Sequence, residues 1–107
     1  MTRRVKKRYI ALSSEPKTSP EILSKAVVSS YVELFGILGL SSAHLKSVRS
    51  YPDRGIVVIQ CALESVPRLL LAAAAITQVN SDRIAVRVLT ISGTLKSIKE
   101  KLKSMGR

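Results

Sequence analysis

The hydrophobic and polar positions of this chain alternate in some segments and repeat every three or four residues in others. Residues 8–13 alternate, which predicts a strand with Ile10 and Leu12 on one face. The other face carries Tyr9, Ala11 and Ser13. Residues 45–51 also look extended, residues 56–63 are rich in β-branched side chains, and the Pro-Asp-Arg-Gly sequence between them is typical of a turn. These two segments therefore predict a hairpin with a buried second strand.

A fourth extended segment, residues 83–91, is largely apolar on both faces. Alternation predicts one face made of Ile84, Val86 and Val88. The opposite face carries Ala85, Arg87, Leu89 and Ile91. Arg87 is the residue least like its neighbours, and we expect it to reach the rim of the sheet. There it serves either as a phosphate contact or interfacial ion pair, or as a surface arginine.

A helix is predicted to begin near Pro20, where Thr18 or Ser19 can cap the free amides. Glu21 faces the positive end of its dipole, and Gly36 and Gly39 are expected to weaken or stop it. Its three-to-four-residue repeat consists of Leu23, Val27, Tyr31, Leu34, Phe35 and Leu38.

Two further helices are predicted. One begins near Ser65 and runs through the apolar residues 69–76 to a stop near Asn80. Because this helix is apolar nearly all round, we expect other elements to cover it on more than one side. The last begins at Gly93 or Thr94. Its apolar stripe is Leu95, Ile98, Leu102 and Met105, with Lys96, Lys99 and Lys103 beside it.

The predicted order is strand, helix, strand, strand, helix, strand, helix. This order is typical of an α+β fold, a ferredoxin-like, RRM-like split β-α-β sandwich with a four-stranded antiparallel sheet and an added C-terminal helix. A length of 107 residues fits one domain spanning 1–107, with a basic arm at 1–8 and a basic C-terminal helix at 93–107.

The composition excludes several classes of protein. One cysteine, Cys61, and one histidine, His44, allow neither an internal disulfide nor a Cys/His zinc cluster. The longest apolar run has eight residues against the roughly 20 that cross a bilayer. We therefore expect a soluble, cytoplasmic chain without a membrane segment or signal peptide.

Positive charge lies at the two ends of the chain, whose formal net charge is +11. Residues 1–8 carry five basic side chains and no acid, and residues 81–107 carry seven basic and two acidic ones. The 72 residues between them hold six basic and five acidic side chains. Such clusters release counterions from phosphates, so the pattern favours a nucleic acid over an acidic membrane surface or a merely solvated charge excess.

No catalytic apparatus is visible. His44 lacks a triad partner, the seven acids are scattered, and Cys61 reads as core filler within a strand. The third strand has Ile56, Val58 and Cys61 where an RNA-recognition module places stacking rings, so sequence-specific reading of single strands is not expected.

The turn after the fourth strand, Ser92-Gly93-Thr94, presents free amides and hydroxyls that suit a phosphate oxygen or simply cap the helix. Two sets of candidate site residues follow. The RNA-binding set is Arg3, Arg4, Lys6, Lys7, Arg8, Arg87, Ser92, Thr94, Lys96, Lys99 and Lys103. The partner-binding set, which could equally be core, is Leu34, Phe35 and Leu38.

Several segments carry a family likeness. They are Arg-Tyr-Ile at 8–10, Leu-Phe-Gly-Ile-Leu-Gly-Leu-Ser at 34–41 leading to Leu45-Lys46, the strand at 55–61, the alanine-rich helix, and above all residues 84–96. The most specific part is a strand ending in Ser-Gly-Thr, followed by an aliphatic residue and Lys. Together these segments, which cover most of the chain, resemble the archaeal ribonuclease P protein component 2 family, related to the eukaryotic Pop-five subunit.

The resemblance implies a non-catalytic subunit of the ribonucleoprotein endonuclease that removes the 5′ leader of precursor tRNA. In that enzyme the RNA is the catalyst and holds the magnesium, so no cofactor is expected on the protein. The resemblance further implies pairing with protein component 3, a TIM-barrel-like subunit, as two copies of each. Together they would act on the catalytic domain of the RNA, beside other ribonuclease P proteins, with precursor tRNA contacted indirectly.

Two other functions stay open. The first is a ferredoxin-like dimeric domain that binds a small ligand and regulates an enzyme. The second is a stand-alone nuclease, which requires metal-dependent cleavage by the chain without RNA.

Overall fold

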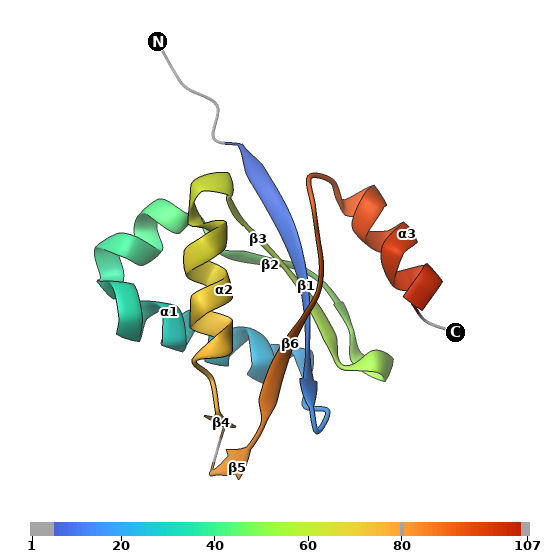
Figure 1. Ribbon diagram of the computed structural model, residues 1–107, viewed down its shortest axis with the longest axis horizontal. Helices are drawn as coiled ribbons and strands as arrows, with labels where there is room; N and C mark the ends of the chain where they lie inside the picture. Colours follow the sequence, from blue (N-terminus) through green and yellow to red (C-terminus); the bar gives the residue numbers. More distant parts are fainter. Residues whose placement is uncertain (1–5, 80, 106–107) are drawn as a thin grey trace.

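Four strands form one antiparallel sheet in the order β2-β3-β1-β6 in the computed structural model, which describes residues 6–79 and 81–105. The strands are β1 (Lys7–Glu15), β2 (Lys46–Tyr51), β3 (Ile56–Ala62) and β6 (Ala85–Ser92). Helices α1 (Pro20–Ala43) and α2 (Val66–Ala74) cover one face, and α3 (Leu95–Met105) lies on the other (Figure 1). This arrangement confirms the predicted fold class.

The central strand β1 divides its side chains between two cores as alternation predicts. Ile10 and Leu12 are fully buried in the core under α1 and α2. Ala11 is fully buried in a smaller core under α3, against which Tyr9 also packs. We call the side of the sheet that carries the first core the α1/α2 face, and the side that carries the second core the α3 face.

A β-bulge corrects one predicted face of β6. Ala11 pairs with Thr90 and Leu12 pairs with Val88, so Leu89 is an extra residue in the ladder. Ile91 therefore packs on the α1/α2 face, whereas strict alternation wrongly placed it beside Leu89. A one-residue insertion exchanges the two faces for every residue that follows it.

Helix α1 begins where the sequence predicts and continues further. The Ser19 hydroxyl accepts a hydrogen bond from the Ile22 amide at 3.4 Å. Gly36 breaks the helix with φ 76° and ψ 174°, a left-handed conformation that favours glycine. The helix resumes and ends at Ala43, so Gly36 weakens it as expected but Gly39 does not stop it.

By length and composition, α1 is the one helix in the described ranges that could cross a membrane. The sequence did not suggest this, because serines and a glutamate interrupt its apolar runs. Leu23, Val27 and Tyr31 are instead fully buried against the sheet. A core helix passes the same test of length and composition.

Helix α2 is shorter than predicted and keeps one side exposed to solvent. It ends at Ala74 rather than near Asn80, which lies outside the described residues. Leu69 is fully buried, and the helix packs against both α1 and β6 as expected, whereas Leu71 on the open side is 57% exposed. Beyond the helix, β4 (Gln78–Val79) and β5 (Asp82–Arg83) form a small hairpin that the sequence reading missed.

The hairpin turn contains the short 3₁₀ helix η1 (Pro52–Arg54). Gly55 follows at φ 64°, again in the left-handed region. A second 3₁₀ turn, η2 (Leu63–Ser65), links β3 to α2.

Helix α3 is held on the sheet by apolar contacts and by two hydrogen bonds. Of the predicted apolar stripe, Ile98 and Leu102 are buried, whereas Met105 at its end is 51% exposed. The Arg54 guanidinium donates to the Leu102 carbonyl at 3.0 Å, and the Lys101 ammonium donates to the Ile91 carbonyl at 3.3 Å.

Candidate nucleic-acid interface

One end of the sheet gathers polar side chains from all four strands. The register pairs Tyr9 with both Gln60 and Ser92, and pairs Lys46 with Gln60. Residues paired across neighbouring strands project to the same side. Lys46, Gln60, Tyr9 and Ser92 therefore form one line across the α3 face, which we call the polar row.

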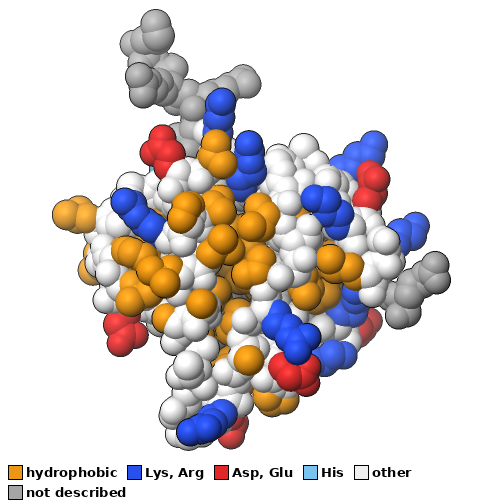
Figure 2. All heavy atoms as spheres, in the orientation of Figure 1, with side chains coloured by type: hydrophobic (Ala, Val, Ile, Leu, Met, Phe, Trp, Pro, Cys, Tyr) orange, Lys and Arg blue, Asp and Glu red, His pale blue; other side chains and the backbone are white. Residues whose placement is uncertain are grey.

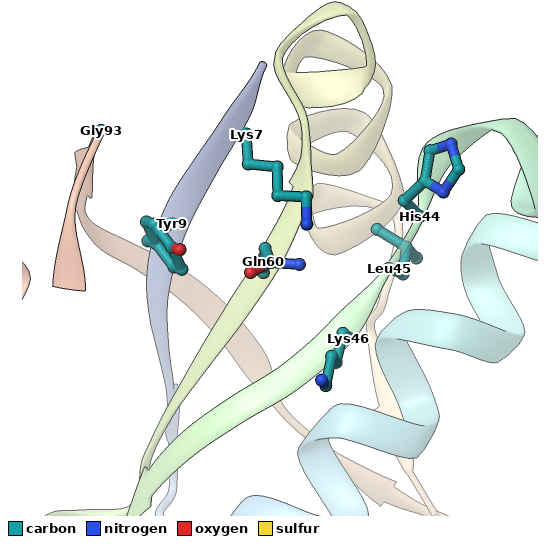
Figure 3. A pocket seen from close by; sticks show the side chains of 7 residues that line it. All are labelled: Lys7, Tyr9, His44, Leu45, Lys46, Gln60 and Gly93. Carbon is teal, nitrogen blue, oxygen red and sulfur yellow. The ribbon is translucent and has the colours of Figure 1, made fainter. Parts of the chain in front are cut away.

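The polar row opens into a cavity of about 850 Å³. Its lining consists of Lys7, Tyr9, His44, Leu45, Lys46, Gln60 and Gly93. In Figure 3 the Tyr9 ring stands between Gly93 and Gln60, and Lys7 extends toward Gln60. With two lysines and no acid in this lining, the cavity attracts anions.

The N-terminal arm reaches the same end of the sheet. Lys6 and Lys7 are exposed, and Arg8 is half-buried. The Arg8 guanidinium donates to the Lys7 carbonyl at 2.9 Å and lies 3.6 Å from the position a Cβ would take at Gly93. The structure thus brings the end of the arm to the turn at 92–94. The other two arginines of the predicted arm, Arg3 and Arg4, lie outside the described residues.

The Thr94 hydroxyl caps helix α3, and the Ser92 hydroxyl bonds the amide of that capping residue. Ser92 Oγ accepts from the Thr94 amide at 3.4 Å, and Thr94 Oγ1 accepts from the Ser97 amide at 3.1 Å. The structural role is therefore confirmed. Each hydroxyl keeps its proton for a further acceptor, and contact with a phosphate stays a prediction.

Three lysines of α3 project away from the sheet. Lys96, Lys99 and Lys103 are all exposed, and their spacing of three and four residues places them along one side of the helix. Lys96 lies close to the turn at 92–94, whereas Lys103 lies about 10 Å further along the helix. They extend the basic surface away from the polar row.

Arg87 lies apart from these groups. It is exposed, as predicted, and pairs with Ser13 near the opposite end of β1. Arg87 and Ser92 are five positions apart, which corresponds to about 16 Å along the strand. The structure therefore does not bring Arg87 to the arm and the turn.

The predicted partner-binding residues differ in exposure. Leu38 is 87% exposed and Leu34 46%, so these two are surface rather than core. Phe35 packs against the core, with its ring centroid 4.9 Å from that of Tyr31 and 5.9 Å from the Arg68 guanidinium carbon. The sequence reading missed Ile37, which is 74% exposed and adjoins the break at Gly36.

We call Leu34, Ile37 and Leu38 the apolar surface of α1. Figure 2 shows hydrophobic side chains gathered over α1 and α2, whereas several Lys and Arg side chains lie over α3. The apolar surface and the basic α3 therefore occupy different sides of the molecule.

The described residues hold no group of three or more His, Cys, Asp or Glu that could bind a metal ion. Cys61 is fully buried, and this burial raises the pKa of its thiol to about 11. Such a thiol is a poor nucleophile at neutral pH, in agreement with its predicted role as core filler. His44 ends α1 in a left-handed conformation, at the rim of the cavity.

Two functional candidates escaped the sequence reading. Lys46 and Gln60 lie on different strands, and nothing in their local sequence distinguishes them. Alternation did place Tyr9 away from Ile10 and Leu12, but only the cross-strand register shows that its neighbours are polar.

Comparison with known proteins gives a consistent picture. Residues 8–103 match the model of the Rpp14/Pop5 family. A Methanosarcina mazei protein named ribonuclease P protein component 2 is 36% identical over 92% of this chain and 84% of its own length. Proteins of the same name from Archaeoglobus fulgidus and Pyrococcus abyssi are 33% and 31% identical, over 92% and 96% of this chain and 89% of each relative.

A solved structure shares the fold. The similar chain occurs in the cryo-electron microscopy structure of yeast ribonuclease MRP, with a TM-score of 0.63. It is 10% identical in sequence, and the match covers 98% of this chain and 97% of that chain. At this identity the likeness concerns the fold.

Proposed function

The chain belongs to the Rpp14/Pop5 family, and from this membership we propose that it is a protein subunit of ribonuclease P, the ribonucleoprotein that removes the 5′ leader of precursor tRNA. In this role the RNA carries out the chemistry and the protein supports it. The observation that carries the proposal beyond family membership is the gathering of Lys7, Arg8, Lys46 and the turn at 92–94 at one end of the sheet.

Phosphate neutralisation is the contribution of this basic surface. Lysines and arginines that replace counterions lower the repulsion between RNA strands that fold close together. The RNA can then hold its magnesium ions at a lower magnesium concentration. The chain itself supplies no metal ligands in this scheme, and it works where the RNA is, in the cytoplasm.

The apolar surface of α1 serves the protein partner. We assign Leu34, Ile37 and Leu38 to the contact with protein component 3, in an assembly with two copies of each subunit. Three exposed leucine and isoleucine side chains within five residues favour a protein partner over solvent. Because basic α3 lies elsewhere, the chain can bind the partner and the RNA at the same time.

The first experiment measures cleavage of precursor tRNA by the matching ribonuclease P RNA at limiting magnesium. This chain and protein component 3 are added singly and together. The pair is expected to raise the cleavage rate, and the two proteins without RNA are expected to cleave nothing. No stimulation by a pair that folds and associates would contradict the proposal and favour a regulatory domain. Cleavage without RNA would instead indicate a nuclease.

The RNA-facing surface is tested by the salt dependence of binding. Lys96→Ala and Lys99→Ala should each lower RNA affinity and reduce the slope of log K against log salt by about one unit for each lost phosphate contact. Lys25→Ala, at an exposed position of α1, is the matched control and should leave the slope unchanged. Equal slopes for all three variants would remove α3 from the interface.

The protein-facing surface needs a separate test. Leu38→Glu should weaken association with protein component 3 at least tenfold, because it places a charge in an apolar contact. Met105→Glu changes an exposed apolar residue of α3 and should have no effect on association. Unchanged affinity for Leu38→Glu would move the partner to another surface.

A further inference from the structure

The polar row contains a single aromatic ring, and this ring comes from β1. The strand β3, on which an RNA-recognition module carries stacking rings, offers Gln60 at the neighbouring position. Tyr9 is half-buried: it packs against the core under α3 and also lines the cavity. The core contact therefore holds Tyr9 in place while the residue stays accessible from the cavity.

Two lysines line the cavity beside this ring. The Cα atom of Lys7 lies two residues along β1 from that of Tyr9, about 7 Å away. The Cα atom of Lys46 lies two strands across the sheet from it, about 10 Å away. Gln60 is between Tyr9 and Lys46, and its amide can both donate and accept a hydrogen bond. The cavity therefore combines a stacking surface, an amide and two separated positive charges within about 850 Å³.

From this combination we propose that the cavity binds one unpaired nucleotide of an RNA strand, with its base stacked on Tyr9. Lys7 and Lys46 contact the phosphates on either side, and the Gln60 amide bonds the edge of the base. The proposal rests on the proposed function, because it specifies which part of the RNA the basic end of the sheet holds. A single ring holds a single base, which agrees with the absence of a stacking platform on β3.

An unpaired base fits this site better than a duplex does. In a duplex, neighbouring base pairs cover both faces of each base, so a ring on a sheet cannot stack on it. A base that leaves the helix exposes a face for stacking and carries its phosphates with it. An acidic peptide would satisfy the lysines but would leave the ring without a partner.

The test measures binding of the full chain to labelled single-stranded hexa-adenylate and hexa-uridylate. The control ligand is an RNA hairpin with a ten-base-pair stem and a short loop whose bases stack on one another, so that it offers no free base to Tyr9. Tyr9→Leu should weaken binding of the single strands by about fivefold to a hundredfold, the range expected for loss of one ring–base stack. Tyr9→Phe keeps the ring and should bind like the unchanged chain. Hairpin affinity should change by less than twofold in both variants.

Lys46→Ala provides an independent variant, because it lies at an exposed strand position and should not disturb folding. It should reduce the salt slope for single strands by about 0.7 units for each lost phosphate contact. Lys25→Ala, on α1, is again the matched control. The unfolding midpoint of each variant shows whether the fold is intact.

Three outcomes would overturn the proposal. They are single-strand binding by Tyr9→Leu equal to that of the unchanged chain, equal losses for Tyr9→Leu and Tyr9→Phe, and binding of a hexa-glutamate peptide as tight as that of the single strands. If salt-dependent binding of ribonuclease P RNA persists in any of these cases, the proposed function stands and only the nucleotide site fails. If the chain binds no RNA at low salt, both fail together.

Discussion

The two faces of the one sheet differ in how completely they are covered. The core under α1 and α2 contains thirteen buried residues, and the core under α3 contains five. The same strands supply both, with Leu12 facing one way and Ala11 the other. Two helices, of 24 and 9 residues, pack on the α1/α2 face, whereas the other face has only α3, which with 11 residues is about 16 Å long.

This difference assigns separate tasks to the two faces. The α1/α2 face supplies most of the apolar burial that stabilises the fold. The α3 face ends in the polar row, where Tyr9 and Gln60 remain accessible beside the arm and the turn at 92–94. A short helix on a sheet thus leaves room for a binding surface without loss of the main core.

The largest expected effect concerns the fully covered face. Leu12→Ala should lower the free energy of unfolding by about 2–5 kcal/mol, because it opens a cavity among fully buried neighbours. Leu38→Ala, at a position that is 87% exposed, should change it by less than about 0.5 kcal/mol. Urea unfolding followed by circular dichroism measures both, and similar losses would contradict the assignment of the core.

The same face contains the buried thiol. Its pKa of about 11 in the folded chain exceeds the ordinary value of 9.0, because burial disfavours the thiolate. Below pH 9 both states keep the proton and Cys61 adds no pH dependence. Between pH 9 and 11 only the unfolded chain releases it, so stability falls as pH rises, by on the order of 2 kcal/mol.

Cys61→Ala is the variant that isolates this effect. It should flatten the pH dependence of the unfolding free energy between pH 9 and 11 relative to the unchanged chain. All other groups are common to the two chains and cancel in the difference. An identical pH dependence in the two chains would show that the thiol titrates normally.

On the α3 face, the hydrogen bond from Arg54 to the Leu102 carbonyl is the stronger of the two that hold α3. Arg54→Ala should lower the free energy of unfolding by about 1 kcal/mol, because a hydrogen bond from a charged donor is lost in a half-buried place. Arg49→Ala, an exposed change on β2, is the control. Thermal unfolding of both variants measures the difference, and equal midpoints would mean that this hydrogen bond contributes nothing.

Loss of the hydrogen bond from Lys101 is expected to have the smallest effect on stability. Lys101→Ala removes an exposed hydrogen bond of 3.3 Å to the Ile91 carbonyl and should cost about 0.5 kcal/mol or less. Hydrogen exchange of the α3 amides is the more sensitive measurement, since α3 should open locally before the sheet unfolds. Faster exchange in α1 than in α3 would reverse the order of stability between the two faces.

The extent to which sequence predicts this fold depends on the element. The capped start of α1 at Ser19 and Pro20, the hairpin turn before Gly55 and the two faces of β1 follow from local patterns, and all are confirmed. The end of α2 and the face of the sheet on which Ile91 lies do not follow from local patterns. Alanines favour a longer helix than the tertiary structure allows, and a β-bulge leaves no mark in the alternation of a strand that is apolar on both sides.

The candidate site divides in the same way. The basic arm, the capping turn and the lysines of α3 are visible as composition and as a motif along the chain. The structure brings Arg8 of the arm to the turn. It leaves Arg87, which the sequence also offered as a candidate, about 16 Å from that turn. The exposure of Leu38 and the packing of Phe35 could not be separated by spacing, because both fall on the apolar repeat of one helix.

The sequence by itself determined the order of the four sheet strands and the three helices, many residues of the main core and the basic character of both ends, since each depends on spacing within a few residues. Only the tertiary structure decided the polar row. Its members, Tyr9, Lys46, Gln60 and Ser92, are separated by up to 83 residues and meet through strand register. Whether such a row remains open depends on how far a helix extends over the sheet, and α3 leaves it uncovered because the length and direction of that helix are set by its docking through Ile98, Leu102 and Arg54.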